Sequence, residues 1–205
     1  MRRILVGFLC LFLLTLTLTA QTGTAKKEAA PAKKAATAPA AGAPQMPQPA
    51  PELKRLAYYA GDWSSEGTMQ ASEFGPGGAF KGKEHNEWFP GKFFLLSHGD
   101  ATMAGMGAMK ELAIFGYNPE KKVYTYHSIS SMGESEDSTG TVSGADWTWT
   151  SDSTVKGKAY KSKFTIHEES PTVYTLKFDM SSDGGKSWKT IMEGKATKAE
   201  KATAK

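Results

Sequence analysis

The chain has 205 residues, of which 25 are Lys or Arg, 21 are Asp or Glu and one is Cys. Residues 1–51 contain 6 of the basic and 1 of the acidic residues, so residues 52–205 have 19 and 20 and a net charge of −1. A nucleic-acid-binding protein needs a basic face, so we do not expect a nucleic-acid partner. The roughly 150 residues of this neutral region suit one domain with a buried core.

The N-terminus has the pattern of a secretory signal peptide. Two arginines precede an apolar run from Ile4 to Leu18, and small residues then offer cleavage after Ala20 or Ala25. Fifteen apolar residues are fewer than the roughly 20 that span a membrane, so no stable membrane span is expected. Cys10 lies in the middle of the run, which argues against a lipoprotein. We therefore predict a signal peptide at residues 1–20 and an exported protein, periplasmic or extracellular.

Residues 21–51 have the composition of a linker. Of these 31 residues, 11 are Ala and 6 are Pro, and two lysine pairs are interspersed. This segment has too little apolar bulk to offset the entropy of ordering. We predict that 21–51 is a disordered linker, that 52–197 is the folded domain and that 198–205 is a disordered tail.

The folded domain begins with a short amphipathic helical segment that ends at Gly61 and leads to Trp63. Glycine adopts a positive φ at a helix end without strain. Trp63 then enters the first predicted strand as the largest apolar side chain near the start of the domain.

From Trp63 onward the chain alternates apolar and polar residues in short runs, which glycine- and proline-rich turn signals separate. One buried and one wet face in each strand indicate an antiparallel meander, and closure into a barrel removes the exposed edges. A two-sheet sandwich is the alternative. The predicted fold is all-β, a single antiparallel barrel of about ten strands after a short helix, with strands near 62–71, 80–89, 92–103, 110–118, 122–131, 134–143, 146–151, 157–168, 172–181 and 187–197.

Four short motifs give the domain a family resemblance. They are Leu56 with Gly61-x-Trp63, the segment from Glu87 to Phe93, the turn from Gly116 to Pro119 with Tyr124, and Trp188 with Glu193. In these the chain resembles the bacterial calycin-like (lipocalin-like) family catalogued as domain of unknown function 1579. The resemblance implies that Trp63 closes one end of the barrel beneath a cation from the last strand, with Lys195 as first candidate and Lys198 as second.

Barrels of this size usually hold a small molecule, so the sequence favours a binding protein for a small hydrophobic or amphipathic ligand. Because large aromatics share the inward faces with Ser65, Gly67, Asn86 and Ser162, we predict a cavity that opens near residues 103–109. The predicted ligand-binding residues are Trp88, His98, Met103, Met106, Tyr126, Trp149, Phe164, Tyr174 and Phe178.

Other functions stay open on the sequence alone. Thioethers at Met103, Met106 and Met109 suit copper(I), and any of the four histidines is a conceivable haem ligand. An enzyme acting on a lipid or glycan, with His98 or Asp100 at the barrel mouth, is a further alternative, as is an interaction module. No catalytic motif is present, and Glu84 and Glu87 differ in strand parity, so they are not expected to act as a carboxylate pair.

Overall fold

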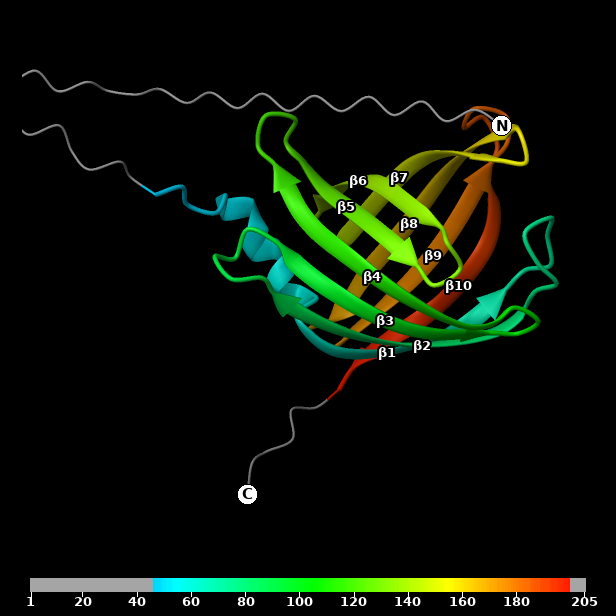
Figure 1. The fold of residues 1–205 in the computed structure, drawn as a ribbon, viewed down its shortest axis with the longest axis horizontal. Helices are drawn as coiled ribbons and strands as arrows, with labels where there is room; N and C mark the ends of the chain where they lie inside the picture. The colour runs from blue at the N-terminus through cyan, green and yellow to red at the C-terminus, as the bar shows by residue number, and fades with distance from the viewer. Residues whose placement is uncertain (1–45, 200–205) are drawn as a thin grey trace, which may run out of the picture. The chain divides into compact units, whose positions relative to one another are not determined.

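The computed structural model describes residues 46–199. One short helix is followed in the chain by ten antiparallel strands, which form a closed barrel (Figure 1). Neighbouring strands along the chain pair with each other, and β1 also pairs with β10. The predicted all-β barrel is therefore confirmed. The elements are the 3-10 helix η1 (Pro51–Tyr58) and strands β1 (Gly61–Met69), β2 (Gly78–Trp88), β3 (Leu95–Met103), β4 (Gly107–Asn118), β5 (Val123–Ser130), β6 (Ser135–Ser143), β7 (Asp146–Val155), β8 (Lys158–Ser170), β9 (Val173–Ser181) and β10 (Lys189–Lys198).

Three predicted segments lie wholly or partly outside the described residues. These are the signal peptide 1–20, most of the linker 21–51 and all but the start of the tail 198–205. The folded elements extend one residue beyond the predicted domain at each end, because η1 begins at Pro51 and β10 ends at Lys198. No helix within residues 46–199 is long and apolar enough to cross a membrane.

The barrel closes through the β1–β10 ladder, which pairs Trp63 with Lys198 and Met69 with Met192. β1 also pairs with β2 along its whole length, from Gly61 opposite Asn86 to Met69 opposite Gly78. Both hydrogen-bonding edges of β1 are therefore paired. The absence of a free edge protects a barrel from edge-to-edge association.

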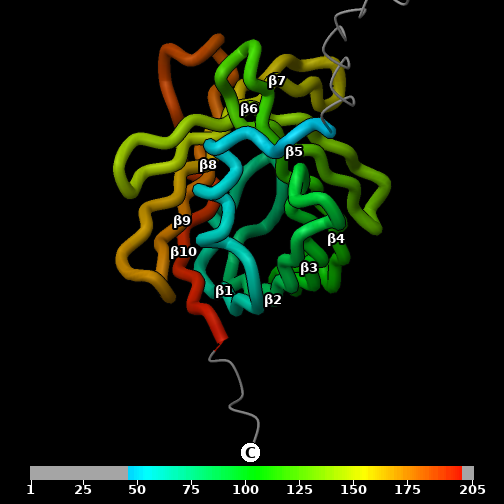
Figure 2. The backbone as a smooth tube through the Cα atoms, turned by 90° about the vertical axis from the view of Figure 1, so that its left-hand side faces the viewer, coloured from blue at the N-terminus to red at the C-terminus, as the bar shows by residue number. Residues whose placement is uncertain are grey.

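The helix η1 lies across one end of the barrel (Figure 2). Leu53 and Leu56 are buried beneath it, and Gly61 then takes a φ of 109°, as predicted for the residue that turns the chain into β1. Tyr58 Oη lies 2.9 Å from the carbonyl oxygens of both Ser170 and Val173. These contacts attach the helix to the loop between β8 and β9 and close this end of the barrel.

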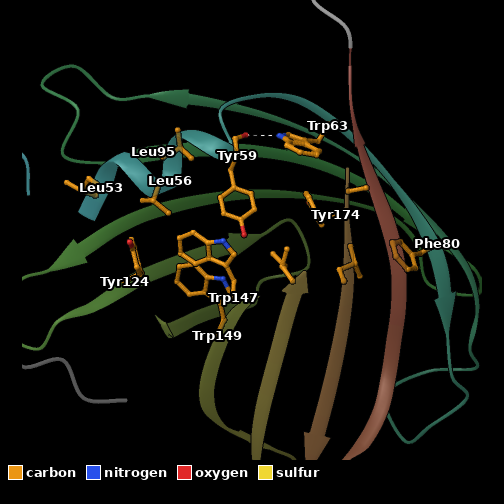
Figure 3. Packing of buried hydrophobic residues seen from close by; sticks show 13 residues of the cluster. Leu53, Leu56, Tyr59, Trp63, Phe80, Leu95, Tyr124, Trp147, Trp149 and Tyr174 are labelled. Carbon is orange, nitrogen blue, oxygen red and sulfur yellow. Dashed lines mark hydrogen bonds between the residues drawn. The ribbon is translucent and has the colours of Figure 1, made fainter. Parts of the chain in front are cut away.

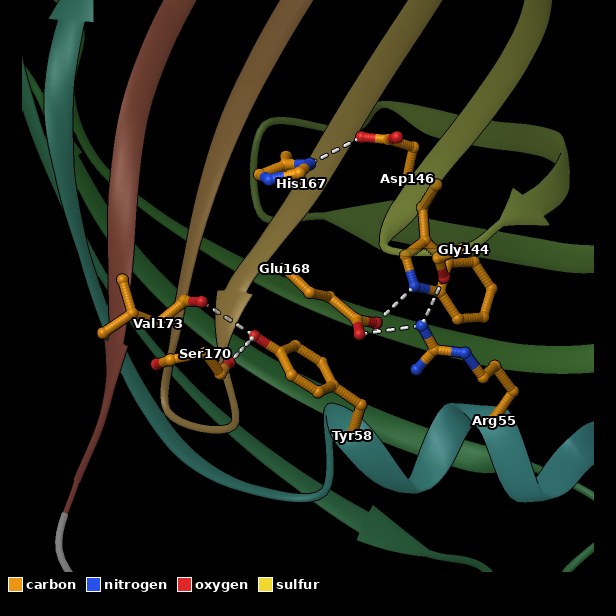
Figure 4. Close-up of polar contacts among 9 residues, drawn as sticks. Arg55, Tyr58, Gly144, Asp146, His167, Glu168, Ser170 and Val173 are labelled. Atoms are coloured by element: carbon orange, nitrogen blue, oxygen red, sulfur yellow. Dashed lines mark hydrogen bonds and ion pairs between the residues drawn. The ribbon is translucent and has the colours of Figure 1, made fainter.

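An ion pair also attaches the helix to β8, close to the Tyr58 contacts (Figure 4). The Arg55 guanidinium donates to Glu168 Oε2 at 2.7 Å and to the Gly144 carbonyl at 2.9 Å. The other oxygen of Glu168 accepts from Trp147 Nε1 at 2.7 Å. Since the Glu168 side chain is only 12% exposed, this carboxylate depends on both donors for its solvation.

The core beneath η1 is mostly aromatic (Figure 3). Trp147 and Trp149 stack with ring planes 3° apart, and Tyr59 packs on the edge of Trp147 at 5.4 Å between centroids. Trp63 is 2% exposed and packs against Tyr174 at 4.8 Å. The Tyr59 carbonyl accepts from Trp63 Nε1 at 2.8 Å and from Asn86 Nδ2 at 2.9 Å. The chain segment between η1 and β1 is thus hydrogen-bonded to both β1 and β2.

Lys198, not Lys195, is the cation beside Trp63. Its Nζ lies 5.1 Å from the indole centroid and donates to the Tyr58 carbonyl at 3.0 Å. The first candidate, Lys195, binds Glu169 at 3.0 Å on the outer surface. The correction follows from strand periodicity, because residues three apart in a strand point to opposite faces. Lys198 is directly opposite Trp63 in the ladder, so it shares the inner face with the tryptophan.

Trp63→Ala should lower the free energy of unfolding by about 3–5 kcal/mol, as for other buried large-to-small changes. Lys198→Met should cost about 0.5–2 kcal/mol, the range for a cation–π contact. Urea denaturation of both variants measures these losses. Lys195→Met is the matched control, and a loss there as large as that of Trp63→Ala would contradict the assignment.

Arg55→Met should destabilise the protein by about 1–3 kcal/mol, because it removes two hydrogen bonds and leaves Glu168 with fewer donors. Hydrogen exchange should also become faster across residues 51–59. The neighbouring exposed residue provides the control Lys54→Met, which should change neither quantity. Unchanged exchange in the Arg55 variant would mean that the ion pair does not hold the helix.

Candidate functional site

The interior of the barrel contains a cavity of about 340 Å³. The prediction of an interior cavity is therefore confirmed. It is lined by inward-facing side chains from most of the strands and by Tyr59 from the plugged end. Two of its sides differ in chemistry.

One side, here called the aromatic wall, consists of Phe115, Tyr126, Trp149, Phe164 and Phe178. Phe115 packs against Tyr126 at 4.9 Å and against Trp149 at 5.6 Å between ring centroids. Phe164 and Phe178, on neighbouring strands, lie 6.3 Å apart. This wall offers a large apolar surface of well-ordered rings to a bound molecule.

A second set of lining residues, here called the acidic wall, contains Glu84 on β2, Glu111 on β4 and Glu136 on β6 and partly overlaps the strands of the aromatic wall. Tyr126 Oη donates to Glu111 Oε1. Glu136 Oε1 accepts from Ser138 Oγ at 2.6 Å and from Ser151 Oγ at 2.9 Å. Among residues 46–199, none of these three glutamates forms an ion pair with a lysine or arginine.

Burial raises the pKa of Glu84 above its ordinary value of 4.5, and the negative charge of Glu111 raises it further, whereas a hydrogen bond with the Asn86 side chain acts in the opposite direction. Burial likewise raises the pKa of Glu111, although the hydrogen bond from Tyr126 acts in the opposite direction. The pKa of Tyr126 is raised by burial and by the neighbouring Glu111, so its hydroxyl stays a donor. Both glutamates therefore lack the solvation that a free carboxylate has in water.

Two buried polar atoms of residues that line the cavity have no hydrogen-bond partner within the described residues: the Tyr59 hydroxyl and Asn86 Oδ1. Tyr59 is 5% and Asn86 4% exposed, and both line the cavity. In Figure 3 the Tyr59 hydroxyl points away from the helix backbone, into the barrel. Buried polar groups are rarely left unsatisfied, so an unpaired acceptor at a cavity surface indicates a place for a donor from a ligand or water.

Six of the nine predicted ligand-binding residues line this cavity: Met103, Tyr126, Trp149, Phe164, Tyr174 and Phe178. Trp88 faces inward but is the last residue of β2, where it packs against the aromatic core beneath η1. Met106 is 37% exposed in the turn between β3 and β4, next to Gly75. Met103 and Met109 line the cavity, so the three thioethers of the copper hypothesis are divided between the turn and the interior.

His98 is exposed on the outer face of β3, opposite His85 in the ladder. The expectation that it lies at the site is wrong, because it alternates with the inward residues Ser97 and Gly99. His85, His127 and His167 each pair with an aspartate of the neighbouring strand, at 2.7, 2.8 and 2.7 Å. All four histidines are exposed outside the cavity, so a haem bound there would need a different axial ligand.

The residues suggested for catalysis do not come together in the cavity. Asp100 is among the residues that line the cavity, but its side chain is exposed and binds Lys110 on the outer surface. Glu84 lines the cavity whereas Glu87 is exposed, as strand parity predicts. The described residues also contain no group of three or more His, Cys, Asp or Glu side chains arranged to hold a metal ion.

A larger hollow of about 780 Å³ lies on the outer surface of β10 and of strands β1 to β4. Its polar lining consists of exposed side chains, including Lys81, Lys83 and Glu66. Two further members, Lys110 and Lys195, already pair with Asp100 and Glu169. The interior cavity is the better candidate site, because buried aromatic rings and unpaired buried polar atoms line it.

Glu84, Glu111, Glu136 and Tyr59 were not among the predicted site residues. The parity that placed Asn86 inside also places Glu84 inside, two residues earlier on the same strand. Glu111 follows the inward Met109 by two residues in the same way. The signal was therefore present in the alternation, but glutamates on a strand are normally assigned to the wet face.

Comparison with known families identifies the domain. The model described as "Protein of unknown function (DUF1579)" matches residues 48–198. The chain belongs to the DUF1579 family. This match covers the helix and all ten strands and confirms the resemblance that the motifs indicated. No curated protein matches the chain.

Solved structures that align with this DUF1579 protein share little sequence with it. The crystal structure of Rv2717c from M. tuberculosis aligns with a TM-score of 0.51 and 13% identity, covering 75% of this chain and 100% of that one. The S-type phycobiliprotein lyase CPES from Guillardia theta aligns with a TM-score of 0.49 and 9% identity, covering 72% and 92%. At these identities the likeness concerns the fold alone.

Glu84→Gln should stabilise the protein at neutral pH. The pKa of the Glu84 carboxyl is higher in the folded protein than its value of 4.5 in the unfolded chain. The folded protein therefore loses stability as the pH rises from 4.5 through the folded-state pKa, because the buried carboxyl is forced to ionise. A glutamine amide does not ionise, so this loss is absent in the variant. We expect a gain of about 0.5–2 kcal/mol at pH 7 that disappears below about pH 4. Chemical denaturation at several pH values measures it. Glu87→Gln, on the outer face of the same strand, should change stability by less than about 0.5 kcal/mol, and a loss in Glu84→Gln at pH 7 would contradict the assignment.

Proposed function

We propose that this protein is an exported binding protein whose barrel holds a small amphipathic molecule. The observation that carries the proposal is the interior cavity, which combines the aromatic wall with two buried, unpaired polar atoms, Tyr59 Oη and Asn86 Oδ1. A volume of about 340 Å³ lies within the range of small-molecule sites, which are mostly apolar with a few converging polar groups.

Binding would follow from the two walls in different ways. Burial of an apolar ligand body against the rings of Trp149, Phe164 and Phe178 supplies most of the free energy, at roughly 25 cal/mol for each Å² removed from water. The polar atoms determine orientation, because a ligand that leaves them unpaired gains less than one that satisfies them. The helix η1 closes one end, so entry is by the other end, near the β3–β4 turn.

The proposal of export rests on the arginines and apolar run at the N-terminus and on the small residues after them. The N-terminal sequence of the protein from its own host should begin at residue 21 or 26. An intact N-terminus in the membrane fraction, or palmitate on Cys10, would contradict this part of the proposal.

Native mass spectrometry of protein purified from its own host should reveal a co-purified small molecule. Gly99→Leu should abolish that adduct, and it should weaken binding of the neutral fluorophore Nile red at least tenfold. Gly99 lines the cavity, and a Cβ there would make only ordinary contacts, the nearest 3.5 Å from Glu111 Cβ. The added side chain would therefore fill the cavity without displacing the backbone.

His98→Leu is the matched control, since it adds an apolar side chain on the opposite face of the same strand. It should bind Nile red as the wild type does. The absence of both a co-purified molecule and saturable dye binding in the wild type would overturn the proposal, as would equal losses in the two variants.

A further inference from the structure

The positions of the acidic side chains in the barrel give the cavity a more specific chemistry. Glu84 on β2 lies opposite Gly99 on β3, and Gly99 lies opposite Glu111 on β4. The two glutamates are therefore on the same inner face, two strands apart, and the residue between them has no side chain. Neighbouring strands are about 4.8 Å apart, so the two carboxylates flank a gap roughly as wide as a small polar head group.

The gap is open and lies inside the site. A Cβ built on Gly99 would meet nothing closer than 3.5 Å, and Gly99, Glu84 and Glu111 all line the cavity. Any larger residue at position 99 would occupy the space between the carboxylates. The strand pairing therefore produces a small pocket. The backbone of Gly99 forms its base, and Glu84 and Glu111 lie on either side.

No protein cation neutralises this pocket within residues 46–199. Lys83 and Lys110 neighbour the two glutamates in sequence. Lys83 is among the residues that line the cavity, but strand alternation turns its exposed side chain to the outer face, and Lys110 pairs with Asp100. Lys198 is at the plugged end, over Trp63 and hydrogen-bonded to Tyr58. Two half-buried carboxyls, each raising the cost of ionising the other, are thus left without a partner of opposite charge.

An independent observation points to the same kind of ligand. Asn86 Oδ1 lies on the same face of β2 as Glu84, two residues away, and it is a buried acceptor without a donor. Its amide nitrogen already donates to the Tyr59 carbonyl, which determines which way the oxygen points. A ligand N–H would satisfy this acceptor, whereas a ligand carboxylate or carbonyl would be repelled.

We propose that the ligand has an apolar body and one protonated amine, and that Glu84 and Glu111 bind the ammonium above Gly99. The apolar body packs against the aromatic wall, and Asn86 Oδ1 accepts one of the remaining N–H groups. Charge-assisted hydrogen bonds of this kind are about twice as strong as neutral ones. This inference rests on the proposed function, because it names the ligand class of the same cavity.

The test compares three probes of one shape that differ only in the head group: 1-naphthylmethylamine, 1-naphthalenemethanol and 1-naphthoate. Calorimetry with the full-length mature protein at pH 7 should give at least tenfold tighter binding for the amine than for the alcohol, and the weakest binding for the carboxylate. The double variant Glu84→Gln/Glu111→Gln should bind the amine at least tenfold less tightly than the wild type does, with no change for the alcohol. Glu87→Gln on the outer face should keep the wild-type order.

The outcomes separate this inference from the proposed function. If the alcohol binds as tightly as the amine in the wild type, the cavity binds small molecules but the ammonium assignment is wrong. If the carboxylate binds best, or if the double variant keeps the amine preference, the assignment is also wrong. If no probe binds and no molecule co-purifies with the protein, both proposals fail. Thermal melts of the variants show whether a loss of binding is caused by unfolding. None is expected for the Glu84→Gln change, because it is predicted to raise stability.

Discussion

Everything described in this molecule depends on the pairing of the first strand with the last. Nine antiparallel hairpins along the chain would give only a curved sheet with two open edges. The β1–β10 ladder joins those edges, places Lys198 opposite Trp63 and encloses the inward side chains. Because the two strands are far apart in sequence, their pairing carries a large loop-closure cost that the buried aromatic core must offset. The plug formed by η1 and Tyr59 lies at the end of this ladder and stabilises it through Trp63 and Asn86.

The two ends of the interior have different roles. Beneath η1 the side chains are aromatic, closely packed and hydrogen-bonded to one another or to the backbone, as the contacts of Trp63 and Trp147 show. Farther into the barrel, glutamates, serines and glycines are interspersed among the aromatic side chains that line the cavity. An interior optimised only for stability would fill this space with leucine or phenylalanine. Proteins retain buried polar groups of this kind at sites where function opposes stability.

Much of the architecture could be predicted from the sequence. Alternation and turn residues are local signals, and they identified all ten strands in the right order. No local signal contains the closure, which was predicted because it removes the exposed edges of a ten-strand meander. The prediction of Lys195 as the cation on Trp63 was wrong because it relied on position in the last strand and did not count parity from Trp63. The same omission placed His98 at the site.

The acidic wall could not be recognised in the same way. Each of its glutamates comes from a different strand, and only the three-dimensional register brings Glu84 and Glu111 to either side of Gly99. A glutamate in an alternating run has the appearance of a solvent-facing residue unless the inward face has already been assigned. The sequence also cannot predict that Asn86 Oδ1 lacks a partner among the described residues. The orientation of the Asn86 amide depends on the position of the Tyr59 carbonyl, to which its nitrogen donates.

The hydrogen-bond register of β3 also determines the charge of the cavity, because it places Gly99 and not a charged neighbour on the inner face. A shift of this strand by one residue relative to β2 and β4 would turn its outer face inward. The interior would then contain an imidazole from His98 and, beside Glu84, Glu111 and Glu136, a fourth carboxylate from Asp100, where it now has open space. The shifted barrel would differ little in backbone shape, yet its cavity would be narrower and altered in electrostatic potential. In this barrel, strand alignment therefore determines the charge and shape of the cavity as directly as the identity of any single side chain.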